Sequence, residues 1–349
     1  MKQNKNLFIG IVIGALISGV LSFFILNKLS KAQVHFQQMQ ITEQAELIDS
    51  IRHSGMAILL CNILDKVDAE LATNPKRLLS DETIARIAAV SYSLISHIQN
   101  DSDSVPGKIV SPERGELLLM LSKMKIDSAS LKKIMLQTSF AGAVLRDADL
   151  KQADLTGVDL KGADLENANL ENANLYEANL RSANLWGSNL NAAILNGADL
   201  TRANLAWSDL SGADLKRAEL YGAILNSAQL RKADLQGVNL QWADLIGTFL
   251  TESNLGGANL FRANLNRANL EKTNLSNAKL TLSTLTEANI EGANLTGTEL
   301  TSAVLNEKNW LTLLDAWSVI GAKEILSKYK MAAESPKNPL QYRLEKIKD

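Results

Sequence analysis

The sequence predicts a mainly β protein whose central part winds into a solenoid of short, stacked coils. Every fifth residue from 145 to 305 is leucine, with Ile290 as the only exception among 33 positions. The residue two places earlier is alanine at 24 of these positions and valine, serine or threonine at the others. Aspartate or asparagine stands between the two at 23 positions. A period that never slips over so many units is the signature of a repeat architecture.

The five-residue period predicts how each unit is oriented. In an extended chain alternate side chains share one side, so the leucine (position i) and the small residue at i−2 face inward together. The aspartate or asparagine at i−1 then faces outward, and positions i+1 and i+2 remain for a turn. Twelve of the 13 glycines in 141–305 lie at i+2, where a positive φ or a close approach helps. Because Glu177, Trp207 and Arg217 occupy the same position, we expect that a positive φ is not required in every corner.

The repeated units, for instance ADLENANLENANLYEANL at 163–180, closely resemble the A(D/N)LXX pattern of the pentapeptide-repeat family. The resemblance covers about residues 140–305. It implies a right-handed quadrilateral β-helix with four repeats per coil, in about eight coils that each rise ~4.8 Å. Two weaker units, at 129–131 and 134–136, show a similar small-or-apolar pattern. We therefore expect the coil to begin near Leu131 and assign 129–305 to the β-helix.

An apolar segment near the N-terminus predicts a membrane anchor. After a flank of residues 1–6, residues 7–26 carry no charge, and a helix of that length spans roughly 30 Å, the thickness of a hydrocarbon core. A cleaved signal peptide is the competing interpretation, although its apolar region is usually shorter. The sequence is thus interpreted as a single-pass membrane protein.

The anchor leaves its orientation and its association state open. Lysines flank it on both sides, so the positive-inside rule hardly distinguishes the two orientations. We expect the globular part on the non-cytoplasmic side. Small residues every fourth position on one helix face would allow a homodimer through the anchor. These residues are Gly10, Gly14, Ser18 and Ser22.

Residues 27–128 are predicted to be an α-helical juxtamembrane or cap region. One helix extends to about Thr73, either packed on its own domain or as a short coiled coil. A second begins at Ser80 or Asp81, and a third has Ser111 as its cap and Pro112 in its first turn.

After the repeat, residues 306–333 fit an amphipathic helix with a bend at Gly321. Because an open last coil exposes its core and unpaired backbone, we expect this helix to cap the solenoid. A dimer contact through the C-terminal helix is the alternative. Residues 334–349 are polar and are expected to form a loosely ordered tail.

The composition argues against an enzyme. The chain has one cysteine, Cys61, and three histidines without ligand-like spacing, and it carries no phosphate loop, dinucleotide fingerprint or nucleophile–base set. We predict no catalytic, cofactor-binding or metal-binding residues and no direct nucleic acid binding, since the net charge is −2. The many outward carboxylates are interpreted as turn chemistry.

We therefore predict a membrane-tethered scaffold that binds an unidentified protein partner through outward-facing apolar side chains. If twenty residues return to the same face, these side chains form two groups, which either are free for a partner or contact the terminal helices. The first group is Tyr221, Trp242 and Phe261, and the second is Trp186, Trp207, Ile246 and Phe249.

The alternative function comes from the family resemblance. One branch of that family mimics duplex DNA and acts on DNA gyrase. One coil of this chain is acidic, with Asp149, Asp154, Asp159 and Asp164, but basic residues are interspersed beyond it.

Overall fold

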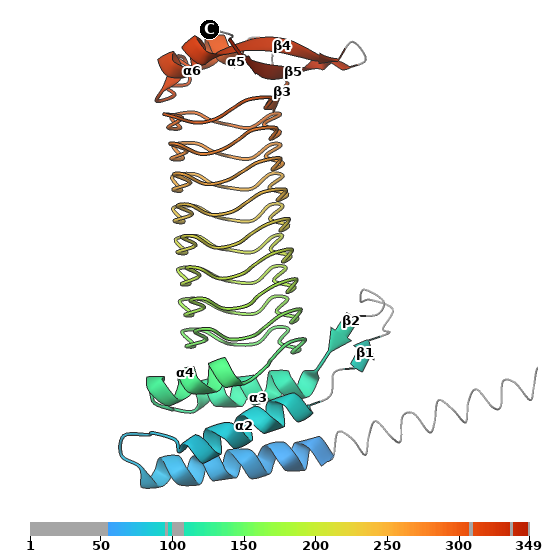
Figure 1. Cartoon of the computed structure of the whole chain (residues 1–349), viewed down its shortest axis with the longest axis vertical. Coiled ribbons are helices and arrows are strands. Elements are labelled where there is room, and N and C mark those ends of the chain that lie inside the picture. Colours follow the sequence, from blue (N-terminus) through green and yellow to red (C-terminus); the bar gives the residue numbers. More distant parts are fainter. Residues whose placement is uncertain (1–54, 95–96, 100–107, 307–309, 336–337, 348–349) are drawn as a thin grey trace, which may run out of the picture. The chain divides into compact units, whose positions relative to one another are not determined.

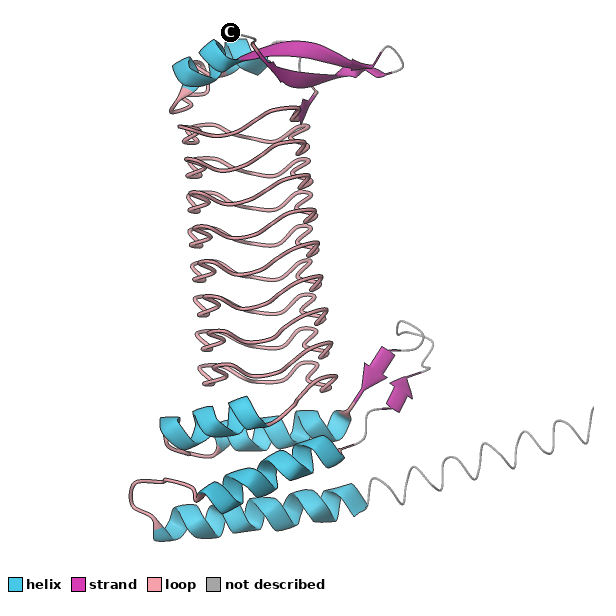
Figure 2. Cartoon of the chain, viewed as in Figure 1, coloured by secondary structure: helices cyan, strands magenta, loops and turns pink. Residues whose placement is uncertain are grey.

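The computed structural model describes residues 55–94, 97–99, 108–306, 310–335 and 338–347. The chain divides into two compact units, Met1–Leu59 and Leu60–Asp349. The larger unit is a stack of coils closed at one end by helices and at the other by a small sheet (Figures 1 and 2).

The helical region before the stack contains the predicted helices. Residues 55–73 are helical, and the part from Leu60 buries an apolar face that ends at Leu71. Helix α2 is Asp81–Ser93, with the Ser80 hydroxyl accepting from the Thr83 N–H as an N-cap. Two short strands, β1 (His97–Gln99) and β2 (Lys108–Val110), pair antiparallel after it.

Helix α3 (Pro112–Lys123) begins as predicted, with Ser111 as its N-cap and the proline in its first turn. It is followed by helix α4 (Ser128–Gln137), for which the Asp127 carboxylate caps the N-terminus. Leu117, Leu118 and Ile134 are fully buried, so both helices contribute to a core beneath the first coil.

No helix among the described residues is long and apolar enough to cross a membrane. The predicted anchor, residues 7–26, lies outside the described residues.

The repeat forms the predicted β-helix. Parallel bridges join each i−1 residue to its counterpart on the next coil, as Asp149 to Asn169 and Asn169 to Asn189 on one of the four faces. The Leu150 N–H donates to the Asn169 carbonyl, and the Asn169 N–H donates to the Ala148 carbonyl, both at 2.8 Å. Each coil thus contains four pentapeptide units, and its backbone is hydrogen-bonded to the coils on either side.

The interior of the coils is filled by the leucines and the small residues at i−2. From residue 145 to 305 every position i is at most 4 % exposed. The hydroxyls that replace alanine at i−2 are also satisfied. Ser188 donates to the Leu185 carbonyl of its own coil at 2.8 Å, whereas Thr248 reaches the Leu225 carbonyl of the preceding coil at 2.9 Å. The stack is therefore closed to any internal pocket along its repeat.

The corners correct one expectation. Position i+2 has a positive φ in every unit from 142 to 302, including Glu177 (54°), Trp207 (63°) and Arg217 (55°). The prediction that corners with such residues do not require a positive φ was wrong. The turn is closed by a hydrogen bond from the i−2 N–H to the preceding leucine carbonyl, 3.1 Å for Ala153 to Leu150. The i+2 N–H also donates to the next coil, 2.9 Å for Gln152 to Glu171, and the corner keeps the left-handed conformation whatever the side chain.

The start of the coil is also later than predicted. Residues 129–137 belong to helix α4, so the expected beginning near Leu131 and the boundary at 129 were wrong. The Asp127 cap favours a helix there, and small and apolar residues three to four apart satisfy a helical face as well as a coil. The first bridge of the stack pairs Ser111 with Ala143.

Helix α3 is seated on the first coil. The Ser111 N–H donates to the Gly142 carbonyl at 2.7 Å, and Arg114 donates to the Ala141 carbonyl at 2.8 Å. At Gly115 the helix and coil approach so closely that a Cβ would lie 2.1 Å from the Val144 carbonyl oxygen. Partial burial lowers the pKa of the Arg114 guanidinium despite the nearby Asp159 and other negative groups.

The C-terminal region closes the other end with more elements than the single predicted helix at 306–333. It contains α5 (Trp310–Leu313), α6 (Ala322–Lys328), β4 (Tyr329–Ser335) and β5 (Asn338–Lys346). Gly321, at φ 88°, is the N-cap of α6. The stretch expected to be a polar tail is largely strand β5, which pairs antiparallel with both β4 and the short strand β3 (Val304–Leu305).

The cap supplies hydrogen-bond partners to the last coil. The carbonyl of Trp317 accepts from the Gly292 N–H at 2.7 Å, and the carbonyl of Ile320 accepts from Leu295 at 2.8 Å. The Tyr329 hydroxyl accepts from the Leu300 N–H at 3.0 Å. Backbone groups that would meet a further coil are thereby satisfied, which is the role expected of a solenoid cap.

The junction at Gly115 gives a test of the N-terminal seating. We expect Gly115→Ala to lower the melting temperature, because the new methyl group overlaps the Val144 carbonyl, and such overpacking costs about 1–3 kcal/mol. Glu116→Ala, at an exposed position of the same helix, is the matched control and should melt like the parent protein. Equal melting temperatures for parent and Gly115→Ala, measured by circular dichroism, would contradict the close approach.

Candidate interaction surface

The register of the bridges places the corresponding residues of successive coils in a single column. The i+1 and i+2 positions therefore form four corners along the stack. We name them by one residue each, as follows: the Trp186 corner (146–147 to 286–287), the Arg231 corner (151–152 to 291–292), the Lys216 corner (156–157 to 296–297) and the Tyr221 corner (161–162 to 301–302).

The first predicted group lies together on the Tyr221 corner. Tyr221 is 39 % exposed, Trp242 48 %, and Phe261 is half-buried. The Arg262 guanidinium lies over the Trp242 ring, 4.5 Å from its centroid, and 5.5 Å from the centroid of Phe261. These residues belong to three consecutive coils, so they follow one another along the corner, and a cation lies over two of the rings.

The second predicted group lies on and beside the Trp186 corner. Trp207 is the most exposed, at 65 %, followed by Trp186 at 40 % and Ile246 at 37 %. Phe249 is half-buried on the next face, where the Arg231 guanidinium lies 5.6 Å from its ring centroid. These exposed fractions mean that the described residues do not cover the cluster.

Two kinds of surface residue were missed from sequence. Arg262 and Arg231 lie over aromatic rings, and for Arg262 the signal was present, because the length of one coil places it in the same column as Trp242. Ile194 and Ile224 replace the usual aspartate or asparagine at i−1 and are exposed. Departures from the i−1 pattern would have identified them.

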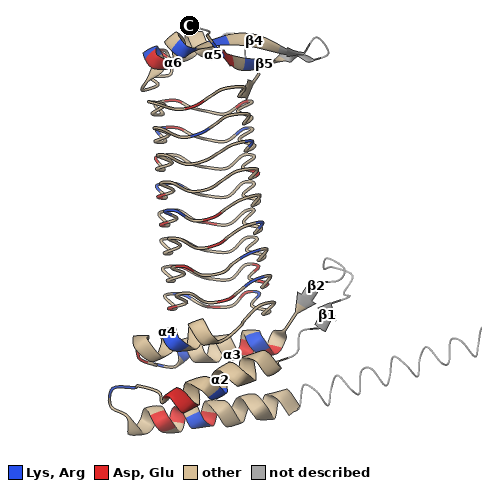
Figure 3. Ribbon diagram, in the orientation of Figure 1, with Lys and Arg blue, Asp and Glu red and all other residues tan. Residues whose placement is uncertain are grey.

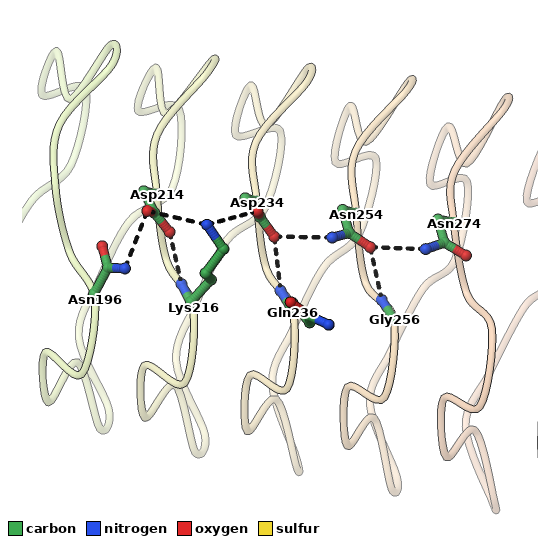
Figure 4. Close-up of polar contacts among 8 residues, drawn as sticks. All are labelled: Asn196, Asp214, Lys216, Asp234, Gln236, Asn254, Gly256 and Asn274. Atoms are coloured by element: carbon green, nitrogen blue, oxygen red, sulfur yellow. Dashed lines mark hydrogen bonds and ion pairs between the residues drawn. The ribbon is translucent and has the colours of Figure 1, made fainter.

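The regular i−1 residues form hydrogen-bonded ladders, shown for one face in Figure 4. The Asn254 side chain donates to Asp234 at 3.0 Å, accepts from Asn274 at 2.8 Å, and accepts from the Gly256 N–H at 3.2 Å. Each such side chain therefore stabilises its own turn and links two coils. This arrangement is the turn chemistry expected from the sequence.

Cations interrupt the acidic columns, and red and blue segments alternate along the stack in Figure 3. Lys216 lies between Asp214 and Asp234, with its ammonium 3.3 and 2.9 Å from their carboxylates (Figure 4). Hydrogen bonds to Asp234 and Asp214 raise the pKa of the Lys216 ammonium above its ordinary value. Arg181 pairs with Asp199 at 3.0 Å in the same manner.

Two shallow hollows lie on the outside of the stack. One, of about 670 Å³, is on the Lys216 corner between Tyr176 and Gly257, where several glycines leave space above the backbone. The other, of about 710 Å³, is on the Arg231 corner and contains both acidic and basic side chains. Within the described ranges, no group of three or more His, Cys, Asp or Glu side chains is arranged to hold a metal ion.

Comparison with known proteins identifies the repeat. The family model for pentapeptide repeats matches residues 134–162, 159–197, 198–237, 239–277 and 263–301, in 8 copies. No curated protein matches the chain.

Several solved structures are similar over the repeat. HetL from the cyanobacterium Nostoc sp. strain PCC 7120, a pentapeptide repeat protein involved in heterocyst differentiation regulation, is 32 % identical with a TM-score of 0.32, over 48 % of this chain and 84 % of that one. Rfr23 from the cyanobacterium Cyanothece 51142 is 30 % identical, with a TM-score of 0.26, over 38 % and 90 % of the two chains. QnrB1, a plasmid-mediated fluoroquinolone resistance protein, is 16 % identical, with a TM-score of 0.22, over 51 % and 96 %.

The side-chain ladder can be tested at Asn254. We expect Asn254→Ala to destabilise the protein by about 1–3 kcal/mol, because three hydrogen bonds are lost and the Asp234 and Asn274 side chains lose a partner. Thr251→Ala is the control, since this hydroxyl makes no hydrogen bond to the described residues, and its effect should stay within roughly 0.5 kcal/mol. Chemical denaturation measures both, and equal effects would show that the ladder contributes nothing.

Proposed function

Because the chain belongs to the pentapeptide-repeat family and its coils are filled by leucine and alanine, we propose that it is a non-enzymatic scaffold that binds a protein partner. The exposed aromatic clusters on two corners carry this proposal. Trp207, Trp242 and Trp186 are at least 40 % exposed on a rod whose outer positions are otherwise mostly polar. Clustered, accessible tryptophan and tyrosine are typical of the residues that dominate binding energy at protein interfaces.

The rigidity of the stack supports the same role. Each coil is hydrogen-bonded to its neighbours through backbone and side-chain ladders, so the aromatic residues hold fixed mutual positions. A binding surface that is ordered before the partner arrives loses less conformational entropy on association. The scaffold would therefore present its two corners as preformed docking sites.

Mimicry of duplex DNA, the alternative, fits the surface less well. A mimic needs a continuous acidic surface, and here the acidic columns are interrupted. Arg146 pairs with Asp164 at 2.7 Å, and Lys216 bridges two aspartates. Ion pairs of this kind neutralise the carboxylates that would have to imitate phosphates.

We also propose that residues 7–26 anchor the protein in a membrane, with the repeat on the non-cytoplasmic side. The proposal rests on the length and uncharged composition of this segment. It would bring the scaffold to a membrane surface and limit its partners to that compartment.

The partner-binding role predicts a loss of capture on aromatic substitution. We expect the amount of partner captured by the immobilised full-length protein to fall about tenfold or more in either of two triple alanine variants. One variant replaces Tyr221, Trp242 and Phe261, and the other replaces Trp186, Trp207 and Ile246. Tyr176→Ala, at an exposed tyrosine of the Lys216 corner, is the control. Unchanged capture by both triple variants, with their folding verified by circular dichroism, would overturn the proposal. Inhibition of DNA supercoiling by the parent protein would favour the alternative.

The anchor predicts a fixed topology. A reporter fused after Asp349 should be active only outside the cytoplasm, and deletion of residues 7–26 should release the protein from the membrane fraction. A reporter active only in the cytoplasm would reverse the orientation, and release of the intact protein by high salt would show that the segment is no anchor.

A further inference from the structure

The Tyr221 corner differs in charge from the rest of the stack. Its i+1 and i+2 positions include four cations, Lys161, Arg181, Arg202 and Arg262, and no aspartate or glutamate. The repeat as a whole is acidic, with 13 Lys and Arg against 19 Asp and Glu in 141–305. Basic and aromatic side chains are therefore interleaved on one corner of an acidic rod.

The Arg231 corner provides the contrast. It also has four cations, but it has four glutamates as well, and three of the cations, Lys151, Lys232 and Lys272, form ion pairs with them. Lys151 lies 2.8 Å from Glu171, and Lys232 lies 3.7 Å from Glu252. Cations on that corner neutralise the protein's own carboxylates and leave little net charge for a partner.

On the Tyr221 corner the central cations have no such partners. Arg202 and Arg262 are exposed, and no ion pair among the described residues joins either of them to a carboxylate. Arg262 instead lies over the rings of Trp242 and Phe261. An aromatic ring accepts no conventional hydrogen bond from a guanidinium held over it, so the N–H groups of Arg262 remain able to donate to a carboxylate.

The spacing of the cluster suits an extended segment. Arg202, Tyr221 with Gly222, Trp242, and Phe261 with Arg262 lie on successive coils. With ~4.8 Å between coils, the distance from Arg202 to Arg262 along the stack is roughly 14 Å. An extended peptide advances about 3.3 Å per residue, so four or five residues would cover this length and could reach both arginines.

We propose that the Tyr221 corner binds an extended, acidic segment of the partner protein, with carboxylates at Arg202 and Arg262 and apolar side chains on the rings between them. This inference rests on the scaffold function proposed above and gives the partner its chemistry. A polyphosphate chain fits less well, because it is charged at every unit and has no apolar side chains to place on the rings of Tyr221, Trp242 and Phe261.

The test uses the purified full-length protein and a fluorescein-labelled peptide of about twelve residues in which glutamate alternates with leucine. We expect salt-sensitive binding, measured by fluorescence anisotropy, that weakens at least about tenfold in Arg262→Glu and in Arg202→Glu. Arg231→Glu is the matched control, because Arg231 also lies over a phenylalanine but on the charge-balanced corner, and it should change the affinity less than about twofold. A peptide with lysine in place of glutamate should not bind.

Three results would overturn the inference. In the first, Arg262→Glu and Arg202→Glu leave the affinity for the acidic peptide unchanged. In the second, Arg231→Glu weakens peptide binding as much as they do. In the third, the protein binds a single-stranded oligothymidylate more tightly than the acidic peptide. The partner-capture experiment is independent of these. If capture depends on Trp242 but the peptide does not bind, the scaffold function is retained and the acidic segment is refuted. If the peptide binds but no partner is captured, the chemistry of the corner is supported and the scaffold function is not.

Discussion

The hydrogen bonds between one coil and the next are the interaction on which the rest of the structure depends. They fix the register at one full coil, and that register decides which side chains share a column. They also force the i+2 residue of every corner into the left-handed region, although most of these residues, Trp207 and Arg217 among them, are not glycine. A left-handed residue costs roughly 1–2 kcal/mol, which the cooperative bonding of the whole stack must offset. Regular leucine burial and the close fit of alanine at i−2 follow from the same tight coil.

Much of this could be predicted from sequence, because a strict period constrains geometry directly. The inward leucines, the outward asparagines and the turn chemistry of residues such as Asn254 all follow from alternation along a strand plus a two-residue turn. The caps of the flanking helices could be identified as well, since Ser80 and Ser111 are residue types that satisfy free N–H groups.

The remainder depended on tertiary contacts that no local pattern encodes. The φ of Trp207 is set by closure of its corner, not by its own preference. Residues 128–137 satisfy both a helical face and the repeat pattern, and the Asp127 cap with the packing of α4 decides between them. Strand β5 forms because the last coil leaves an edge at β3 that requires a partner, and a polar segment gives no sign of that demand. In the candidate site the aromatics were evident, and the length of one coil also places Arg262 in the column of Trp242, but that the guanidinium lies over the ring is visible only in the structure.

Because residues share a column only when they are a whole number of coils apart, insertions and deletions of different lengths affect the surface differently. Gain or loss of one whole coil would leave every column above it in phase, so Trp242 and Arg262 would stay neighbours wherever the change occurred outside them. Insertion of a single pentapeptide unit between them would keep the interior intact, since leucine would still follow leucine. It would nevertheless rotate everything beyond it, the C-terminal cap included, by one face relative to the preceding coils and would separate the ring from the cation. The fold thus accommodates the insertion of single pentapeptide units, whereas the columns of surface residues are preserved only when whole coils are inserted.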